Sequence, residues 1–237
     1  MDSLALWRLF TRLGEAQILL PAMALALWWL WRTPRTRPLA LHWALATAAG
    51  AALTTASKLA FMGWRVGYAP WDYTGISGHA FFAAAVLPVL ARVAAGPLPR
   101  PWPRLAVGAG VALAAAIAYS RLPTHAHSAS EALLGFALGC AASLPALRRS
   151  AAPQAPTPWV LPAALVAWLL ALPLQAPPSR THDWVQAWSV ELSGRHRPFT
   201  RADLHRPPGH DALTRAVLGG LRHGPGRQVQ QQPVAQR

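Results

Sequence analysis

The stretch from Tyr119 to Gly135, YSRLPTHAHSASEALLG, concentrates groups that can act on a phosphate. His127 and Glu131 are four residues apart, so on a helix they are neighbours on one face. A carboxylate beside an imidazole fixes its tautomer and makes its free ring nitrogen a better nucleophile or base. Arg121 adds a planar guanidinium that suits phosphate oxygens. Taken alone, this segment could also be a structural polar cluster that caps two helices.

Two earlier segments carry groups of a related kind. Lys58 and Arg65 are seven residues apart and would share one face of a helix, although both could also be anchors at a membrane interface. Residues 75–79, GISGH, end with His79 immediately before an apolar run. Backbone N–H groups at such a helix start favour an anion. Each segment is a weak signal alone, and the combination is more specific.

Together the segments read Lys58-x6-Arg65, Ser77-Gly78-His79 and Ser120-Arg121-x5-His127-x3-Glu131. This order and spacing resembles the type 2 phosphatidic acid phosphatase family, which shares its site architecture with the vanadium haloperoxidases. The family motifs are Lys-x6-Arg-Pro, Pro-Ser-Gly-His and Ser-Arg-x5-His-x3-Asp. This chain has Val66 and Ile76 where the family has proline, and Glu131 where it has aspartate. Because the extra methylene can still reach His127, we expect retained activity.

The resemblance implies a role for each matched residue. His127 would attack phosphorus and form a phosphohistidine, Glu131 would orient it, and His79 would protonate the leaving oxygen. The phosphoryl oxygens would be held by Lys58, Arg65, Ser77, Gly78 and Arg121. Three cations could replace the metal ions of other phosphatases, so neither a metal nor another cofactor is expected. The implied substrate is a lipid phosphomonoester or pyrophosphate of the phosphatidate, phosphatidylglycerophosphate or undecaprenyl pyrophosphate type.

Three other functions stay open at this point. The chain could be a relative of these phosphatases that is catalytically inactive because Glu131 replaces the aspartate. It could also be a membrane haem protein, or a haloperoxidase with the same site. The haem alternative would take its iron ligands from His42, His79, His125 and His127. His125 matches no motif position, and we expect it to be a bystander.

Membrane helices must position these residues. Apolar runs recur along the first 175 positions of this 237-residue chain, which is 53% hydrophobic. They predict an all-α, polytopic membrane bundle of about six transmembrane helices, at 16–32, 38–57, 79–95, 105–119, 130–147 and 159–175. We expect three regions: an interfacial segment (1–15), the membrane phosphatase domain (16–175) and a basic, Pro/Gly-rich, partly disordered tail (176–237). Within the tail, an amphipathic helix is expected from Trp184 to Leu192. Residues 195–206 are expected to be solvated, with contact to anionic lipid headgroups as the alternative.

The net charge of +14 could indicate nucleic-acid binding, but its distribution favours a membrane topology. Arginines follow the first, third and fifth predicted spans, in loops without acidic residues: Arg32, Arg35, Arg37, Arg92, Arg100, Arg104, Arg148 and Arg149. The positive-inside rule assigns this side to the cytoplasm. We therefore expect a bacterial inner-membrane protein with its site on the periplasmic or extracellular face. Its expected partners are membrane lipids and a lipid phosphate, not nucleic acid.

Overall fold

The computed structural model describes residues 7, 10–96, 98–148, 163–164, 167–168 and 179–206. Contacts divide the chain into two units, Met1–Leu204 and His205–Arg237, and every element named below belongs to the first. Among the described residues there is no β-strand, and a single antiparallel bridge joins Tyr68 to Tyr73. The predicted all-α class is confirmed.

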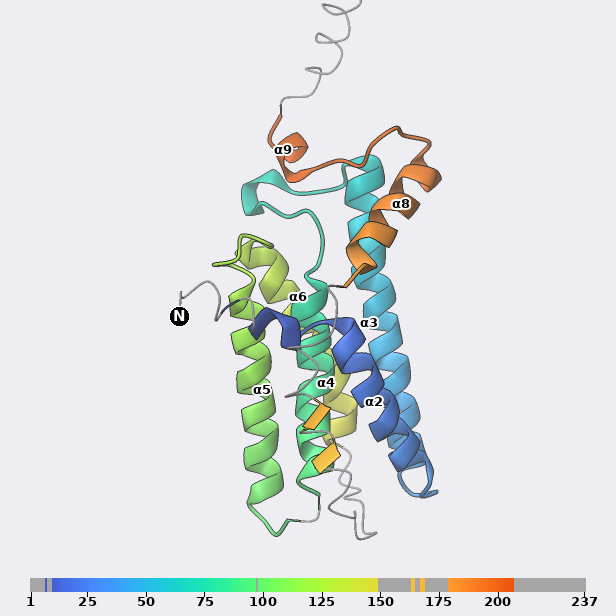
Figure 1. Ribbon diagram of the computed structural model, residues 1–237, viewed down its shortest axis with the longest axis vertical. Helices are drawn as coiled ribbons and strands as arrows, with labels where there is room; N and C mark the ends of the chain where they lie inside the picture. Colours follow the sequence, from blue (N-terminus) through green and yellow to red (C-terminus); the bar gives the residue numbers. More distant parts are fainter. Residues whose placement is uncertain are drawn as a thin grey trace, which may run out of the picture. The chain divides into compact units, whose positions relative to one another are not determined.

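Seven α-helices and one 3-10 helix have described bounds (Figure 1): α2 (Ala16–Trp31), α3 (Arg37–Trp64), η1 (Ala69–Trp71), α4 (Gly78–Ala94), α5 (Trp102–Ser120), α6 (Ala129–Arg148), α8 (Thr181–Ser193) and α9 (Arg201–Leu204). Four stretches are long and apolar enough to cross a membrane: Phe10–Trp31, Arg37–Trp64, Trp102–Ser120 and Ala129–Arg148. The apolar helix α4 is shorter, with 17 residues. The chain is a helical membrane protein. The span predicted at 159–175 lies almost entirely outside the described residues.

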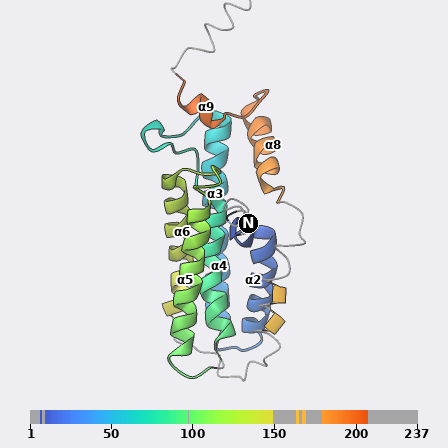
Figure 2. The same cartoon turned by 60° about the vertical axis from the view of Figure 1, so that its left-hand side comes forward.

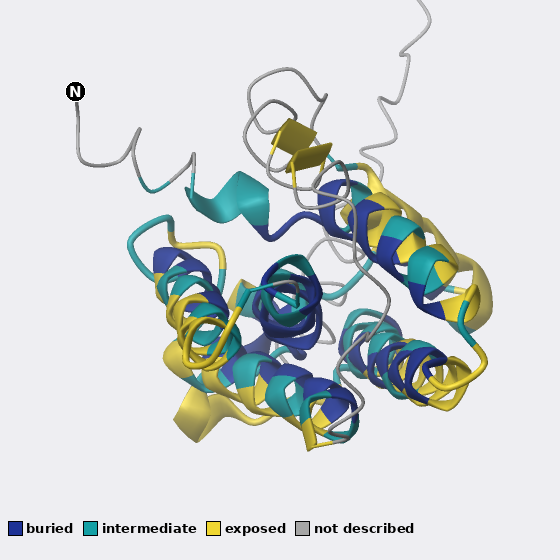
Figure 3. Ribbon diagram, turned by 90° about the horizontal axis from the view of Figure 1, so that it is seen from below, coloured by how far each residue is buried: buried dark blue, intermediate teal, exposed yellow. Residues whose placement is uncertain are grey.

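Helix α4 forms the centre of the bundle, and α2, α3, α5 and α6 pack around it (Figure 3). Its many alanines leave room for neighbouring backbones to approach closely. At Gly139 of α6, an added Cβ would overlap the carbonyl oxygen of Phe81, so only glycine fits this contact. From α3, the Trp43 indole Nε1–H donates to the Ala85 carbonyl at 2.9 Å. These contacts fix the start of α4 between α3 and α6.

Helix α3 is longer than the predicted span, which ended at residue 57. The apolar residues that follow Lys58 continue the helix to Trp64, and the chain leaves it at Arg65, whose φ is 59°. The helix is about 42 Å long, at 1.5 Å per residue. Lys58, which lies just beyond the predicted span, is therefore inside the last two turns of α3.

The two ends of the bundle differ in what they carry (Figures 1 and 2). One end carries loop 32–36 with the start of α3, the end of α4, residues 98–101 with the start of α5, and the C-terminal end of α6. All the arginines named for the positive-inside argument belong to these parts, except Arg149, which is outside the described residues. Loops 65–77 and 121–128 lie at the other end, together with α8 and α9. All three sequence motifs therefore belong to the end with few arginines in its short loops.

The start of the C-terminal tail packs on the bundle instead of standing apart from it. The predicted amphipathic helix is present as α8, which lies against the end of α3. Val185 is buried, whereas Trp184, Trp188 and Leu192 are exposed. The Phe199 N–H donates to the Met62 carbonyl at 2.8 Å, which ties the segment after α8 to α3.

Candidate active site

The three sequence motifs meet at one cavity of about 630 Å³. Its wall contains Lys58 from α3, Gly78 and His79 from the start of α4, and Arg121 and His127 from the loop between α5 and α6. An added Cβ at Gly78 would lie 3.9 Å from Lys58 Nζ, so this ammonium group lies next to the start of α4. Side chains from distant parts of the chain thus face one space.

His127 and Glu131 form a hydrogen-bonded pair at the start of α6. Nδ1 of His127 lies 2.7 Å from Oε2 of Glu131, whose side chain is fully buried. The glutamate therefore reaches the imidazole although it is longer than the aspartate of the similar motif. Because a carboxylate accepts, the proton of neutral His127 lies on Nδ1, and Nε2 keeps its lone pair. This is the tautomer that a nucleophile at Nε2 requires.

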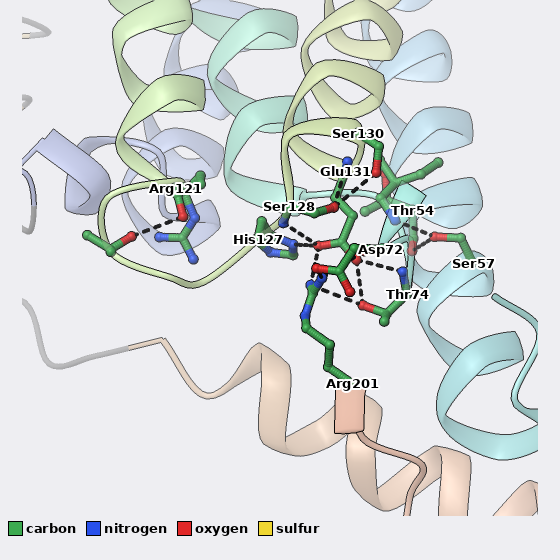
Figure 4. A network of polar contacts seen from close by, with 12 residues as sticks. Thr54, Ser57, Asp72, Thr74, Arg121, His127, Ser128, Ser130, Glu131 and Arg201 are labelled. Atoms are coloured by element: carbon green, nitrogen blue, oxygen red, sulfur yellow. Dashed lines mark hydrogen bonds and ion pairs between the residues drawn. The ribbon is translucent and has the colours of Figure 1, made fainter. Parts of the chain in front are cut away.

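The Glu131 carboxylate accepts hydrogen bonds from four residues (Figure 4). Oε1 accepts from the Thr74 backbone N–H at 2.6 Å and from its hydroxyl at 2.5 Å. Oε2 accepts from the Ser128 backbone N–H at 3.1 Å and from Arg201 Nη2 at 2.7 Å, in addition to His127. Sequence reasoning missed Thr74 and Arg201, because neither matches a motif and Arg201 is 70 residues away along the chain.

The cavity also offers groups that suit an anion. No carboxylate oxygen of the described residues lies within 4.0 Å of Lys58 or Arg121, so their charge is not cancelled by a direct ion pair there. Arg121 is buried, and its Nε finds no acceptor within the described part of the chain. The same holds for the hydroxyl of Ser77, which precedes the first turn of α4. The first N–H groups of α4 add their partial positive charge.

Burial sets the charge states in the loop before α6. It lowers the pKa of His127, as do the charges of Lys58 and Arg121, while the hydrogen bond to Glu131 raises it in part. His127 is therefore neutral at pH 7 and can act as a nucleophile. Burial also lowers the pKa of Arg121 to about 10, and the charge of Glu15 acts in the opposite direction. Arg121 remains a cation at neutral pH.

One predicted phosphate ligand is not brought to the cavity. Arg65 is absent from the cavity wall, because α3 ends there and the residue adopts a left-handed conformation. The expected shared helix face with Lys58 is lost at this point. Ser77 lies at the start of α4 and is buried beside the cavity wall, not part of it.

The other two histidines of the haem alternative, His42 and His125, lie apart from this wall. His125 is exposed, has a φ of 52° and does not line the cavity, which agrees with a bystander. His42 lies about 24 Å along α3 from Lys58, at 1.5 Å per residue. The haem alternative therefore loses His42 as a ligand that could act together with His79 or His127.

The C-terminal segment supplies one wall that the sequence did not predict. Thr181, His182 and Gln186 of α8 and Arg201 of α9 line the cavity. The solvation expected for residues 195–206 is therefore wrong in part, because Arg201 lines the cavity and Asp203 and Leu204 are buried. Apolar side chains line other parts of the wall: Leu20, Ala51, Phe61, Met62, Phe82 and Val185. The cavity has cationic and apolar surfaces side by side, which suits an amphiphilic molecule.

Comparison with known proteins places the chain in a family. No protein-family model matches the sequence, and no solved structure matches the fold. Over 204 residues the chain is 35% identical to an uncharacterized 22.5 kDa protein in the cps region of Klebsiella pneumoniae, and this match covers 84% of the chain and 98% of that protein. The chain belongs to the family of that Klebsiella protein. The similarity extends over most of both chains, so the family shares far more than one short motif.

Proposed function

We propose that this chain is a metal-independent membrane phosphatase, similar to the type 2 phosphatidic acid phosphatases, that hydrolyses a lipid phosphomonoester or pyrophosphate. One observation carries the proposal: His127 lines the same cavity as Lys58, His79 and Arg121, and its Nδ1 lies 2.7 Å from a buried carboxylate. Phosphoryl transfer needs a positioned nucleophile, an acid for the leaving group and concentrated positive charge. We assign the first two roles to His127 and His79, and the positive charge to Lys58 and Arg121.

In the first half of the reaction, His127 Nε2 attacks phosphorus. The new P–N bond forms as the bond from phosphorus to the leaving oxygen breaks, and His79 donates a proton to that oxygen. Glu131 accepts the hydrogen bond that His127 Nδ1–H donates, and it stabilises the positive charge that develops on the imidazole ring. Lys58, Arg121 and the N–H groups at the start of α4 bind the phosphoryl oxygens.

In the second half, water attacks the phosphorus of the phosphohistidine. His79, now neutral, takes a proton from this water as the new P–O bond forms. The P–N bond breaks and its electron pair returns to Nε2 of His127, while inorganic phosphate leaves. His79 is protonated again at the end, so the site is ready for another substrate molecule.

The substrate class follows from the surfaces of the cavity. Its cationic groups suit a phosphate, whereas Leu20, Ala51 and Phe82 offer apolar contacts to a hydrocarbon chain. A lipid phosphate has both parts. A site at the end of a membrane bundle lets the chain of such a lipid stay in the bilayer while its headgroup reacts.

We also propose that the protein lies in a bacterial inner membrane with this site on the periplasmic or extracellular face. The support is the arginine distribution: the arginine-rich short loops lie at the end of the bundle opposite to the cavity. Short loops rich in Lys and Arg remain in the cytoplasm.

The test is phosphate release from a panel of lipid phosphates by the detergent-purified protein, with a chelator present. The proposal predicts release by the wild-type protein and loss of release in His127→Ala. His125→Ala is the matched control, because it removes an exposed histidine of the same loop, and it should keep activity. No release from any lipid, or equal release by His127→Ala, would refute the proposal.

A further inference from the structure

Arg201 connects the C-terminal segment to the catalytic pair. This first residue of α9 donates from Nη2 to Glu131 Oε2 at 2.7 Å (Figure 4). Its Nη1 donates to the Asp72 backbone carbonyl at 2.7 Å and also to the Asp72 carboxylate. The guanidinium therefore bridges Glu131 and the loop after α3. Its side chain is 36% exposed, so solvent reaches it from outside the bundle.

The segment that presents Arg201 has internal contacts of its own. Asp203 accepts from Arg197 Nη1 at 2.8 Å and Nη2 at 3.1 Å. It also accepts from the backbone N–H and the hydroxyl of Thr200, each at 2.8 Å. An acidic residue three positions after a threonine that bonds in this way fixes the start of a helix. Arg201, at the start of α9, is therefore held toward Glu131 by its own segment.

Glu131 needs such a partner more than an aspartate would. A glutamate has one more rotatable bond than an aspartate, so its carboxylate can take more orientations and needs more contacts to fix it. Thr74 and Ser128 donate neutral hydrogen bonds to it. Oε2 already accepts from His127, and Arg201 binds the same oxygen from the C-terminal segment. A charge-assisted bond of this kind keeps the carboxylate ionised and in place.

We propose that Arg201 is a positioning residue of the active site, which holds Glu131 so that His127 keeps its Nδ1–H bond and presents Nε2 to phosphorus. The C-terminal segment thus completes the site. This inference rests on the proposed phosphatase function, and it concerns the rate of the chemical step rather than substrate binding.

The experiment compares Arg201→Met with Arg180→Met in the full-length protein. Both changes remove one arginine charge from the C-terminal segment, and Arg180 is exposed and outside the cavity wall. We expect kcat of Arg201→Met to fall on the order of 10- to 100-fold with KM nearly unchanged, the loss typical of one charge-assisted hydrogen bond. Arg180→Met should keep both constants.

Chemical rescue separates positioning from a merely structural role. Because the site of the Arg201 guanidinium is partly open to solvent, added guanidinium ion should restore part of kcat in Arg201→Met and none in His127→Ala. Arg201→Lys keeps the charge but loses the fork geometry of the guanidinium, so its kcat should lie between those of the wild type and Arg201→Met. If Arg201→Met does not fold, the kcat of Arg201→Lys tests the positioning role instead.

The outcomes distinguish this inference from the function on which it rests. If the wild-type protein releases no phosphate, the phosphatase proposal fails. If the wild type is active and kcat of Arg201→Met or Arg201→Lys equals that of Arg180→Met, the positioning role is wrong and the phosphatase proposal stands. A rise in KM with unchanged kcat, or a fall in kcat without guanidinium rescue, would also overturn it.

Discussion

Replacing Glu131 by aspartate restores the residue found in the similar phosphatase motif, yet we expect it to lower activity. The side chain becomes shorter by one C–C bond, so the 2.7 Å contact to His127 Nδ1 would open to about 4 Å if the backbone stays in place. The contacts to Thr74 and Arg201 would open in the same way. Because the carboxylate is fully buried and accepts from four residues, the chain cannot shift toward all of these partners at once.

The size of the effect follows from the bonds that weaken. A hydrogen bond to a charged group contributes about 1.5–3 kcal/mol, and Glu131→Asp weakens two such bonds, those from His127 and Arg201. Partial relaxation recovers some of this, so we expect a net loss of about 2–3 kcal/mol of transition-state stabilisation, or about 30- to 150-fold in kcat. Glu131→Gln keeps the length but removes the charge, and it should be at least as damaging.

The assay is phosphate release under single-turnover conditions with a lipid phosphate substrate. Glu191→Asp is the matched control, since it makes the same chemical change at an exposed glutamate of α8 and should leave the rate unchanged. Glu131→Asp with activity equal to or above that of the wild type would refute the reasoning, because the contacts around Glu131 would then have no part in the chemistry.

Three further predictions concern pH, packing and topology. Burial lowers the pKa of His127, and only the neutral ring can attack phosphorus. Activity should therefore persist as the pH falls and be half lost only below about pH 6.5. A midpoint above this pH in the rate–pH profile would contradict the prediction. In Gly139→Ala the new Cβ meets the Phe81 backbone, so this change should destabilise the protein by about 1–3 kcal/mol. Gly108→Ala places its Cβ in open space and should change thermal unfolding little. Equal unfolding midpoints of the two variants would show that α6 does not approach α4 so closely. In a Cys140→Ala background, a membrane-impermeant maleimide should label Arg180→Cys in intact cells and Arg100→Cys only after lysis; the reverse pattern would invert the topology.

The sequence predicted the helices and part of the site for separate reasons. Long apolar runs define α2, α5 and α6 to within a few residues, because membrane helices need uninterrupted hydrophobic length. Lys58, His79, Arg121 and His127 could be found because their spacing matches a known set of motifs. Their meeting at one cavity depends on packing around α4, which spacing alone does not encode.

The rest depends on contacts between distant segments. Arg201 is one of nine arginines in the C-terminal tail, and no local pattern marks it as a partner of Glu131. A usable signal was present at Thr200 and Asp203, whose spacing predicts a helix start and therefore an ordered segment. Arg65 was assigned to the site because it matches the first motif of the similar family, but α3 ends at this residue in a left-handed turn, and Arg65 does not line the cavity.

The most direct test of the central claim is to trap the phosphoenzyme. The purified protein is mixed with a lipid carrying radiolabelled phosphate, quenched in alkali and analysed for label on the chain. We predict an acid-labile, alkali-stable label on the peptide that contains His127, absent from His127→Ala and reduced in Glu131→Gln. Phosphate release by the wild type without any label on His127, or the same label in His127→Ala, would contradict the claim that this imidazole is the nucleophile.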